Sequence, residues 1–192
     1  MPDQNNKETL KSQSDDLYRA YGRFAVQFEH ICHATHNAIT FLLHKEGLRN
    51  QQVANIFLAG MTADPLRTLF VSLVGEVKSL NKAEQQIFDN VINRFQKLTE
   101  KRNDIIHGTW FIGWANEQDT EFSNAAGFKH HRNKDGATVK AFDFSAADFD
   151  KLTDEAETLS NLMSRISGCF NLDKSLTNNF SVSQDGTVSL PG

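Results

Sequence analysis

Arg102, Asn103 and His107 are the residues whose types and spacing best suit chemistry. They close the most regular helical pattern of the chain, in the stretch Lys101-Arg102-Asn103-Asp104-Ile105-Ile106-His107-Gly108. An arginine is a permanent planar cation that binds phosphate oxygens, and a histidine can accept or donate a proton near neutral pH. Between them, these side chains could hold a phosphate and move a proton.

The helix that carries these residues is expected to begin near Asn81. Its apolar side chains recur in steps of three and four residues, which predicts one buried stripe made of Ile87, Val91, Phe95 and Leu98. Arg102 continues that stripe, so it points at the core or at a partner, where an unpaired charge is costly. Asn103 and His107 are neighbours one turn apart, whereas Arg102 and His107 lie well apart around a straight helix. Two copies packed across this helix could place Arg102 of one near His107 of the other.

The stretch Arg102-Asn103-Asp104-Ile105-Ile106-His107 resembles the motif of the HEPN superfamily, an arginine often followed by a polar residue and then, after four to six residues, a histidine. The resemblance implies a compact α-helical bundle that dimerises with the two motifs facing each other. Many members are metal-independent endoribonucleases, often toxins or anti-phage effectors, and others are non-catalytic RNA or nucleotide binders. It also implies that Arg102 and His107 are the catalytic pair and that Asn103 supports them.

Such an enzyme needs no metal or other cofactor, because RNA supplies its own nucleophile in the 2′-hydroxyl. His107 would act as the general base on that hydroxyl, and Arg102 would stabilise the charge of the pentavalent phosphate. The expected products carry a 2′,3′-cyclic phosphate and a 5′-hydroxyl. The partners expected are RNA as substrate, a second copy of the chain, and an antitoxin or regulatory protein.

A purely structural interpretation explains the same residues. Histidine followed by glycine is a normal helix ending, because an imidazolium suits the negative end of the helix and glycine suits the position after it. Arg102 could form a buried ion pair with Glu100, Asp104 or a more distant acid. The alternative function is therefore a non-catalytic RNA- or nucleotide-binding protein, or a scaffold protein, of the same fold.

Basic residues near the motif are candidates for RNA binding. Lys97 and Lys101 lie one helical turn or so from Arg102. Lys129 and Arg132 belong to the densest basic cluster, Lys129-His130-His131-Arg132-Asn133-Lys134, which could hold phosphates or could be a solvated hairpin turn.

Trp110 and Trp114 follow the motif directly and could stack a base, although covering the helical bundle is the commoner role of such residues. The three histidines His30, His33 and His36 fall on the outer side of the first long helix. No cysteine or acidic partner with ligand spacing completes a metal site there, so a solvated face is the simpler interpretation.

The elements around these residues predict a mainly α fold, a bundle of about five helices with a small β-hairpin inserted before the last one. Helices are expected at about 14–45, 50–58, 64–80, 81–107 and 145–170, and the hairpin insertion spans 109–144 with a turn at Asp135-Gly136. Residues 14–170 form one expected domain. The polar residues 1–13 indicate a flexible arm, and the Ser-, Asn-, Asp- and Gly-rich residues 171–192 indicate a flexible tail.

Composition sets limits on the class of protein. The formal net charge of −4 argues against an extensively basic surface, so any nucleic-acid binding must come from a local patch. Cys32 and Cys169 lie far apart without metal or redox spacing and are expected to be reduced thiols. No apolar run approaches the roughly 18 residues of a membrane span. These features predict a cytoplasmic protein without a membrane partner.

Overall fold

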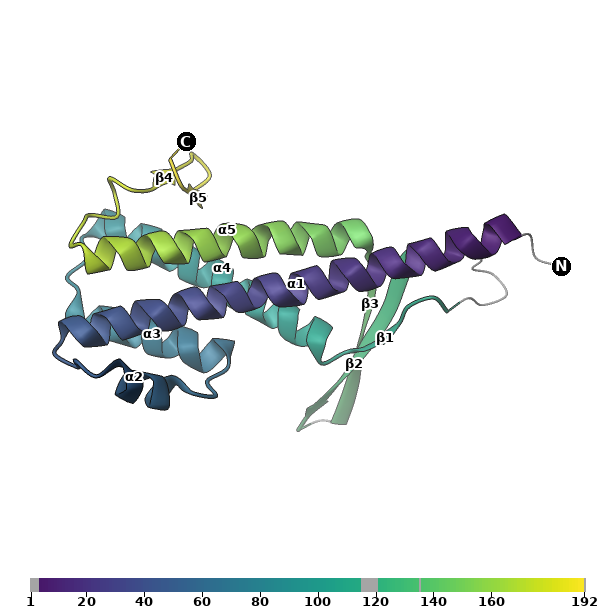
Figure 1. Cartoon of the computed structure of the whole chain (residues 1–192), viewed down its shortest axis with the longest axis horizontal. Helices are drawn as coiled ribbons and strands as arrows, with labels where there is room; N and C mark the ends of the chain where they lie inside the picture. Colours follow the sequence, from purple (N-terminus) through teal and green to yellow (C-terminus); the bar gives the residue numbers. More distant parts are fainter. Residues whose placement is uncertain (1–3, 115–120, 135, 192) are drawn as a thin grey trace. The chain divides into compact units, whose positions relative to one another are not determined.

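The computed structural model describes residues 4–114, 121–134 and 136–191. Within them lie five helices, α1 (Gln4–Lys45), α2 (Gln51–Leu58), α3 (Ala63–Val77), α4 (Lys82–Ile106) and α5 (Ala146–Asn171) (Figure 1). The strands β1 (Thr109–Phe111), β2 (Asn124–Asn133) and β3 (Gly136–Ser145) form an antiparallel sheet before α5. A hairpin of β4 (Ser181–Val182) and β5 (Val188–Ser189) follows α5. The predicted fold class, a helical bundle with a small β insertion before the last helix, is confirmed.

Contacts group the chain into two compact units. The first holds Met1–Gln27 and Glu100–Asp154, and the second holds Phe28–Thr99 and Glu155–Gly192. The candidate motif and the three-stranded sheet both belong to the first unit. Residues 14–170, which the sequence predicts as one domain, contribute to both units.

Aromatic side chains form the core of the first unit. The ring of Trp110 lies 5.6 Å from that of Phe149 and 5.7 Å from that of Phe144, centroid to centroid. Trp110 pairs across the sheet with Gly127, where an added Cβ would come within 2.7 Å of the indole ring. A glycine at position 127 therefore leaves the room that the indole occupies against β2.

The second unit is a helical bundle with phenylalanines at its centre. Phe28 lies 6.2 Å from Phe95, and Phe70 lies 5.6 Å from Phe88, between ring centroids. The predicted apolar stripe of α4 is buried in this unit: Ile87, Val91, Phe95 and Leu98. Burial of these side chains supplies the main force that holds α4 in place.

Side-chain caps set where two helices begin. Asn81 Oδ1 accepts hydrogen bonds from the N–H groups of Ala83 and Glu84, and Glu84 accepts one from the Asn81 N–H in return. Ser145 and Asp148 make the same reciprocal arrangement at the start of α5. The sequence predicted helix starts near Asn81 and at Ser145, and both are confirmed.

Residues 4–13, which the sequence predicts as part of a flexible arm, are helical, because α1 already begins at Gln4. Neither a glycine nor a proline interrupts this polar stretch. A helix that is anchored further along by Leu17, Phe24 and Phe28, all fully buried, can therefore extend outward through it.

Residues after α5, which the sequence predicts as a flexible tail, pack within the second unit. Leu176, Phe180 and Val188 are buried. Arg94 Nη1 on α4 donates a hydrogen bond of 2.8 Å to the carbonyl of Val188. Three well-spaced apolar side chains anchor this segment despite its polar composition.

In the predicted insertion, β2 and β3 pair continuously from Asn124 with Ser145 to Asn133 with Gly136. Asp135, half of the predicted turn, lies outside the described residues, as do residues 115–120. Among the described helices, none has the length and hydropathy that crossing a membrane requires.

Candidate functional site

Arg102 and Asn103 lie in the last turns of α4, and His107 follows the end of the helix at Ile106. The Arg102 and Asn103 side chains are half-buried, whereas His107 is exposed. Arg102 Nη1 donates a long hydrogen bond, 3.4 Å, to Asn103 Oδ1. The motif therefore contains an exposed histidine and a partly sheltered arginine.

Tyr21 of α1 lies near the arginine, a neighbour that the sequence did not indicate. Burial raises the pKa of the Tyr21 phenol, and the positive charge of Arg102 opposes that rise. The Tyr21 ring also packs edge-on against Trp110, at a centroid distance of 6.4 Å. Arg102 is thus placed beside the aromatic core of the first unit.

Three donors hold the end of α4 in a fixed position. The Trp110 indole N–H donates to the carbonyl of Ile105 at 2.7 Å, and Lys129 Nζ donates to the carbonyl of Asn103 at 3.0 Å. The backbone N–H of His107 also donates to the carbonyl of Asn103, at 3.3 Å. These bonds satisfy carbonyls that a helix end leaves without intrahelical partners, and they fix the backbone between Arg102 and His107.

Gly108 makes the tight exit from the helix possible. A Cβ at this position would come within 2.7 Å of the Asp104 carbonyl oxygen. The chain enters β1 directly afterwards, at Thr109. The glycine predicted as the helix stop is therefore required by close packing against the last turn.

Asp104 joins the motif helix to the sheet. Its carboxylate accepts hydrogen bonds from Lys129, at 3.2 Å, and from Lys140, and His131 Nε2 lies 3.9 Å away. Burial would raise the pKa of Asp104, but the hydrogen bonds and charges of the two lysines outweigh it and lower that pKa below its usual value. Asp104, proposed from the sequence as an ion-pair partner of Arg102, is thus engaged by cations of β2 and β3.

The predicted RNA-binding residues differ in exposure and in the unit to which they belong. Lys101 and Arg132 are exposed in the first unit, and Lys97 is exposed in the second. Lys129 is half-buried and contacts both the Asn103 carbonyl and Asp104. The structure therefore brings Lys129 to the motif as a residue that supports the helix end, and leaves Arg132 open on β2.

The two tryptophans have different surroundings. Trp110 is enclosed by Tyr21, Phe142, Phe144 and Phe149, which is the covering role that the sequence favoured. Trp114 is 73% exposed. A stacking role is therefore open to Trp114 and closed to Trp110.

The histidines of α1 do not form a metal centre. His30 and His33 are exposed and His36 is half-buried, and His33 Nε2 lies 3.0 Å from the Asn37 amide nitrogen. Over residues 4–114, 121–134 and 136–191, no group of three or more His, Cys, Asp or Glu side chains is arranged to hold a metal ion.

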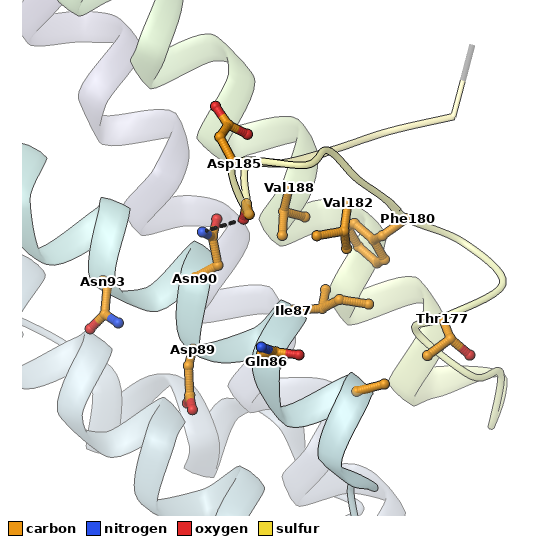
Figure 2. A pocket seen from close by; sticks show the side chains of 12 residues that line it. Gln86, Ile87, Asp89, Asn90, Asn93, Thr177, Phe180, Val182, Asp185 and Val188 are labelled. Atoms are coloured by element: carbon orange, nitrogen blue, oxygen red, sulfur yellow. Dashed lines mark hydrogen bonds between the residues drawn. The ribbon is translucent and has the colours of Figure 1, made fainter.

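A separate groove of about 660 Å³ lies in the second unit, between α4 and the segment that follows α5. Figure 2 shows Asn90 at its wall, donating to the carbonyl of Gly186 at 3.0 Å. Asp89 and Asp185 also line the groove, and the described lining residues include no lysine or arginine. The groove is thus unsuited to phosphate binding, and none of the motif residues lines it.

Comparison of the chain with family models, with curated proteins and with solved structures gives no match.

Proposed function

We propose that the chain is a HEPN-type endoribonuclease that cleaves RNA without a metal ion, at a site built from Arg102 and His107 of two copies. One observation carries this proposal. Arg102 and His107 flank a helix end whose backbone is held by Trp110 and Lys129, with the arginine sheltered and the histidine open to solvent.

His107 would take the proton of the ribose 2′-hydroxyl as its oxygen attacks the neighbouring phosphorus. The bond from phosphorus to the 5′-oxygen then breaks, which leaves a 2′,3′-cyclic phosphate and, once the leaving oxygen is protonated, a 5′-hydroxyl. The exposed position of His107 allows an RNA strand to reach it.

Arg102 would stabilise the added negative charge on the pentavalent phosphate. Its hydrogen bond to Asn103 and its place beside Tyr21 limit the motion of a long side chain. A guanidinium held in place in this way loses less conformational entropy when it binds a phosphate.

The site is proposed to be shared between two copies because of the helix geometry. Residues five apart on an α-helix point about 140° apart around its axis, so Arg102 and His107 of one chain face different directions. A homodimer packed across the end of α4 would place the arginine of one copy beside the histidine of the other.

A second candidate is a non-catalytic RNA- or nucleotide-binding protein of the same fold. It is favoured by the structural duties of the residues around the motif, because Asp104 and Lys129 join α4 to the sheet. In this case Arg102 and His107 would contribute to binding or to stability, and RNA would not be cut.

A cleavage assay separates the two candidates. Wild type, Arg102→Ala and His107→Ala would be incubated with a mixed RNA pool in EDTA. Arg49→Ala and His33→Ala serve as controls, since they replace an arginine and a histidine outside the motif, both exposed. We expect cyclic phosphate ends from wild type and both controls, and a loss of at least about a hundredfold in the two motif variants. Absence of cleavage by wild type, or equal cleavage by His107→Ala, would contradict the enzyme proposal.

A further inference from the structure

The two faces of the three-stranded sheet differ in chemistry. Successive residues of a strand point to opposite faces, and directly paired residues share one. Trp110 and Lys129 lie on the inner face, where they contact the aromatic core and Asp104. Phe111, Phe128 and the residues that follow Phe128 at every second position of β2 therefore lie on the outer face.

The outer face carries a continuous row of rings. Trp114 lies 4.7 Å from Phe111, Phe111 lies 5.6 Å from Phe128, and Phe128 lies 5.3 Å from His130, between ring centroids. Trp114 and His130, the two ends of the row, are exposed. Val139, paired with His130 on β3, is 60% exposed and extends the apolar surface. A contiguous patch of exposed apolar side chains is typical of a binding site, whereas isolated exposed ones are normal on any surface.

The charge beside this row is positive. Arg132, two residues after His130 on the same face, and Lys134 at the end of the hairpin are both exposed. These cations lie toward the hairpin end of the face. The exposed Asp143, paired with Ala126, is on the same face at the other end of β3, where its carboxylate accepts a hydrogen bond of 3.4 Å from the Asn124 side chain. Although the chain has a net charge of −4, Arg132 and Lys134 place positive charge near the exposed ring of His130. Positive charge beside aromatic rings suits a polyanion whose flat groups can stack on those rings.

We propose that the outer face of the sheet binds single-stranded RNA, with bases stacked on Trp114, Phe111, Phe128 and His130 and phosphates held by Arg132. Rings on a sheet face can stack only with bases that are not already paired and stacked in a duplex. The face is not part of the proposed catalytic pair, and its binding of RNA does not depend on cleavage.

The platform also suggests how substrate reaches the proposed catalytic site, a step that does rest on the proposed function. Phe111 is four residues after His107, so their Cα atoms lie at most about 14 Å apart. An RNA strand that runs along the rings toward β1 would therefore approach the exposed histidine.

Fluorescence anisotropy tests the platform. The probe is a fluorescein-labelled single-stranded RNA of about 12 nucleotides, a typical site size for stacking proteins, added in EDTA to chains that also carry His107→Ala so that the probe stays intact. We expect Trp114→Ala to weaken binding about five- to one-hundredfold and Trp114→Phe to restore most of the loss. Arg132→Ala should reduce the slope of log affinity against log salt by about 0.7.

Two variants on the second unit serve as controls. Phe57→Ala removes another exposed aromatic ring and Arg49→Ala another exposed guanidinium, and both should bind the probe like the parent. Lack of probe binding by the parent, unchanged binding by Trp114→Ala, or equal binding of the same RNA as a duplex would each overturn the platform. If the wild-type chain binds the probe but does not cleave it, the platform is supported and the enzyme proposal is rejected. If it cleaves RNA and Trp114→Ala leaves the cleavage unaffected, the enzyme proposal is supported and the platform is rejected.

Discussion

Gly108 is the residue on which the position of His107 depends most directly. The chain leaves α4 so closely that only a hydrogen at this Cα fits against the carbonyl of Asp104. The indole of Trp110 and the ammonium of Lys129 complete the arrangement by occupying the carbonyls of Ile105 and Asn103. A histidine next to such an exit has little backbone freedom, which favours a catalytic group.

Gly108→Ala is therefore expected to lower the free energy of unfolding by about 1–3 kcal/mol, because a methyl group would press on backbone that cannot move aside. Urea denaturation measures the change. Gly75→Ala is the matched control, since an added Cβ there meets nothing within 4 Å and alanine is the better helix former by about 0.5–1 kcal/mol. Equal stability of the two variants would contradict the packing argument at Gly108.

At the residue scale, the types and spacing of the motif could be predicted from the sequence, but its neighbours could not. Tyr21 is 81 residues from Arg102 in the chain, and the lysines that bind Asp104 come from two strands whose register no local pattern reveals. The sequence interpretation treated Lys129 as a residue for RNA. Its actual partners became visible only when β2 was placed beside the end of α4.

At the scale of elements, local chemistry determined where helices begin. The cap of α5 is the clearest case, because Ser145 Oγ donates to Asp148 Oδ2 at 2.7 Å while the Ser145 and Asp148 N–H groups are also bonded. Hydrogen bonds from Ser145, and then from Lys151, lower the pKa of Asp148 to about 2. The cap follows β3 directly, so it also fixes the angle at which the chain leaves the sheet.

Asp148→Ala should lower the free energy of unfolding by about 1 kcal/mol at pH 7, a usual value for a lost cap. The stabilisation depends on the carboxylate. It is therefore present above the ordinary pKa of 3.8 and is lost as the pH falls through the folded pKa of about 2. Thermal unfolding of wild type and variant between pH 7 and pH 2 measures this. A difference in stability that persists unchanged at pH 2 would show that the ionised carboxylate is not its source.

At the scale of the whole chain, composition alone does not reveal that a few apolar residues anchor the polar segment after α5. The residues after α5 are rich in serine, asparagine and aspartate, yet Leu176, Phe180 and Val188 are buried and Arg94 binds the Val188 carbonyl. Three such residues within a polar stretch are too widely spaced to give a periodic pattern. The number and order of the main helices, by contrast, follow from long amphipathic stripes and were predictable.

The anchored segment makes its own prediction. Phe180→Ala should lower the free energy of unfolding by about 3 kcal/mol or more, as expected for a buried phenylalanine, whereas Val182→Ala, at a side chain that is 55% exposed, should change it by less than about 0.5 kcal/mol. Chemical denaturation of the two variants measures both. A flexible tail would leave stability unchanged in each case.

The most direct test of the account mixes two inactive variants. If each site combines Arg102 of one copy with His107 of the other, then a dimer of one Arg102→Ala chain and one His107→Ala chain contains one intact site. Random exchange of subunits makes about half of the dimers mixed, so the mixture should recover about one quarter of wild-type RNA cleavage in EDTA, although each variant alone is inactive. A mixture that exchanges subunits and still cleaves no faster than either variant alone would contradict the shared Arg102–His107 site.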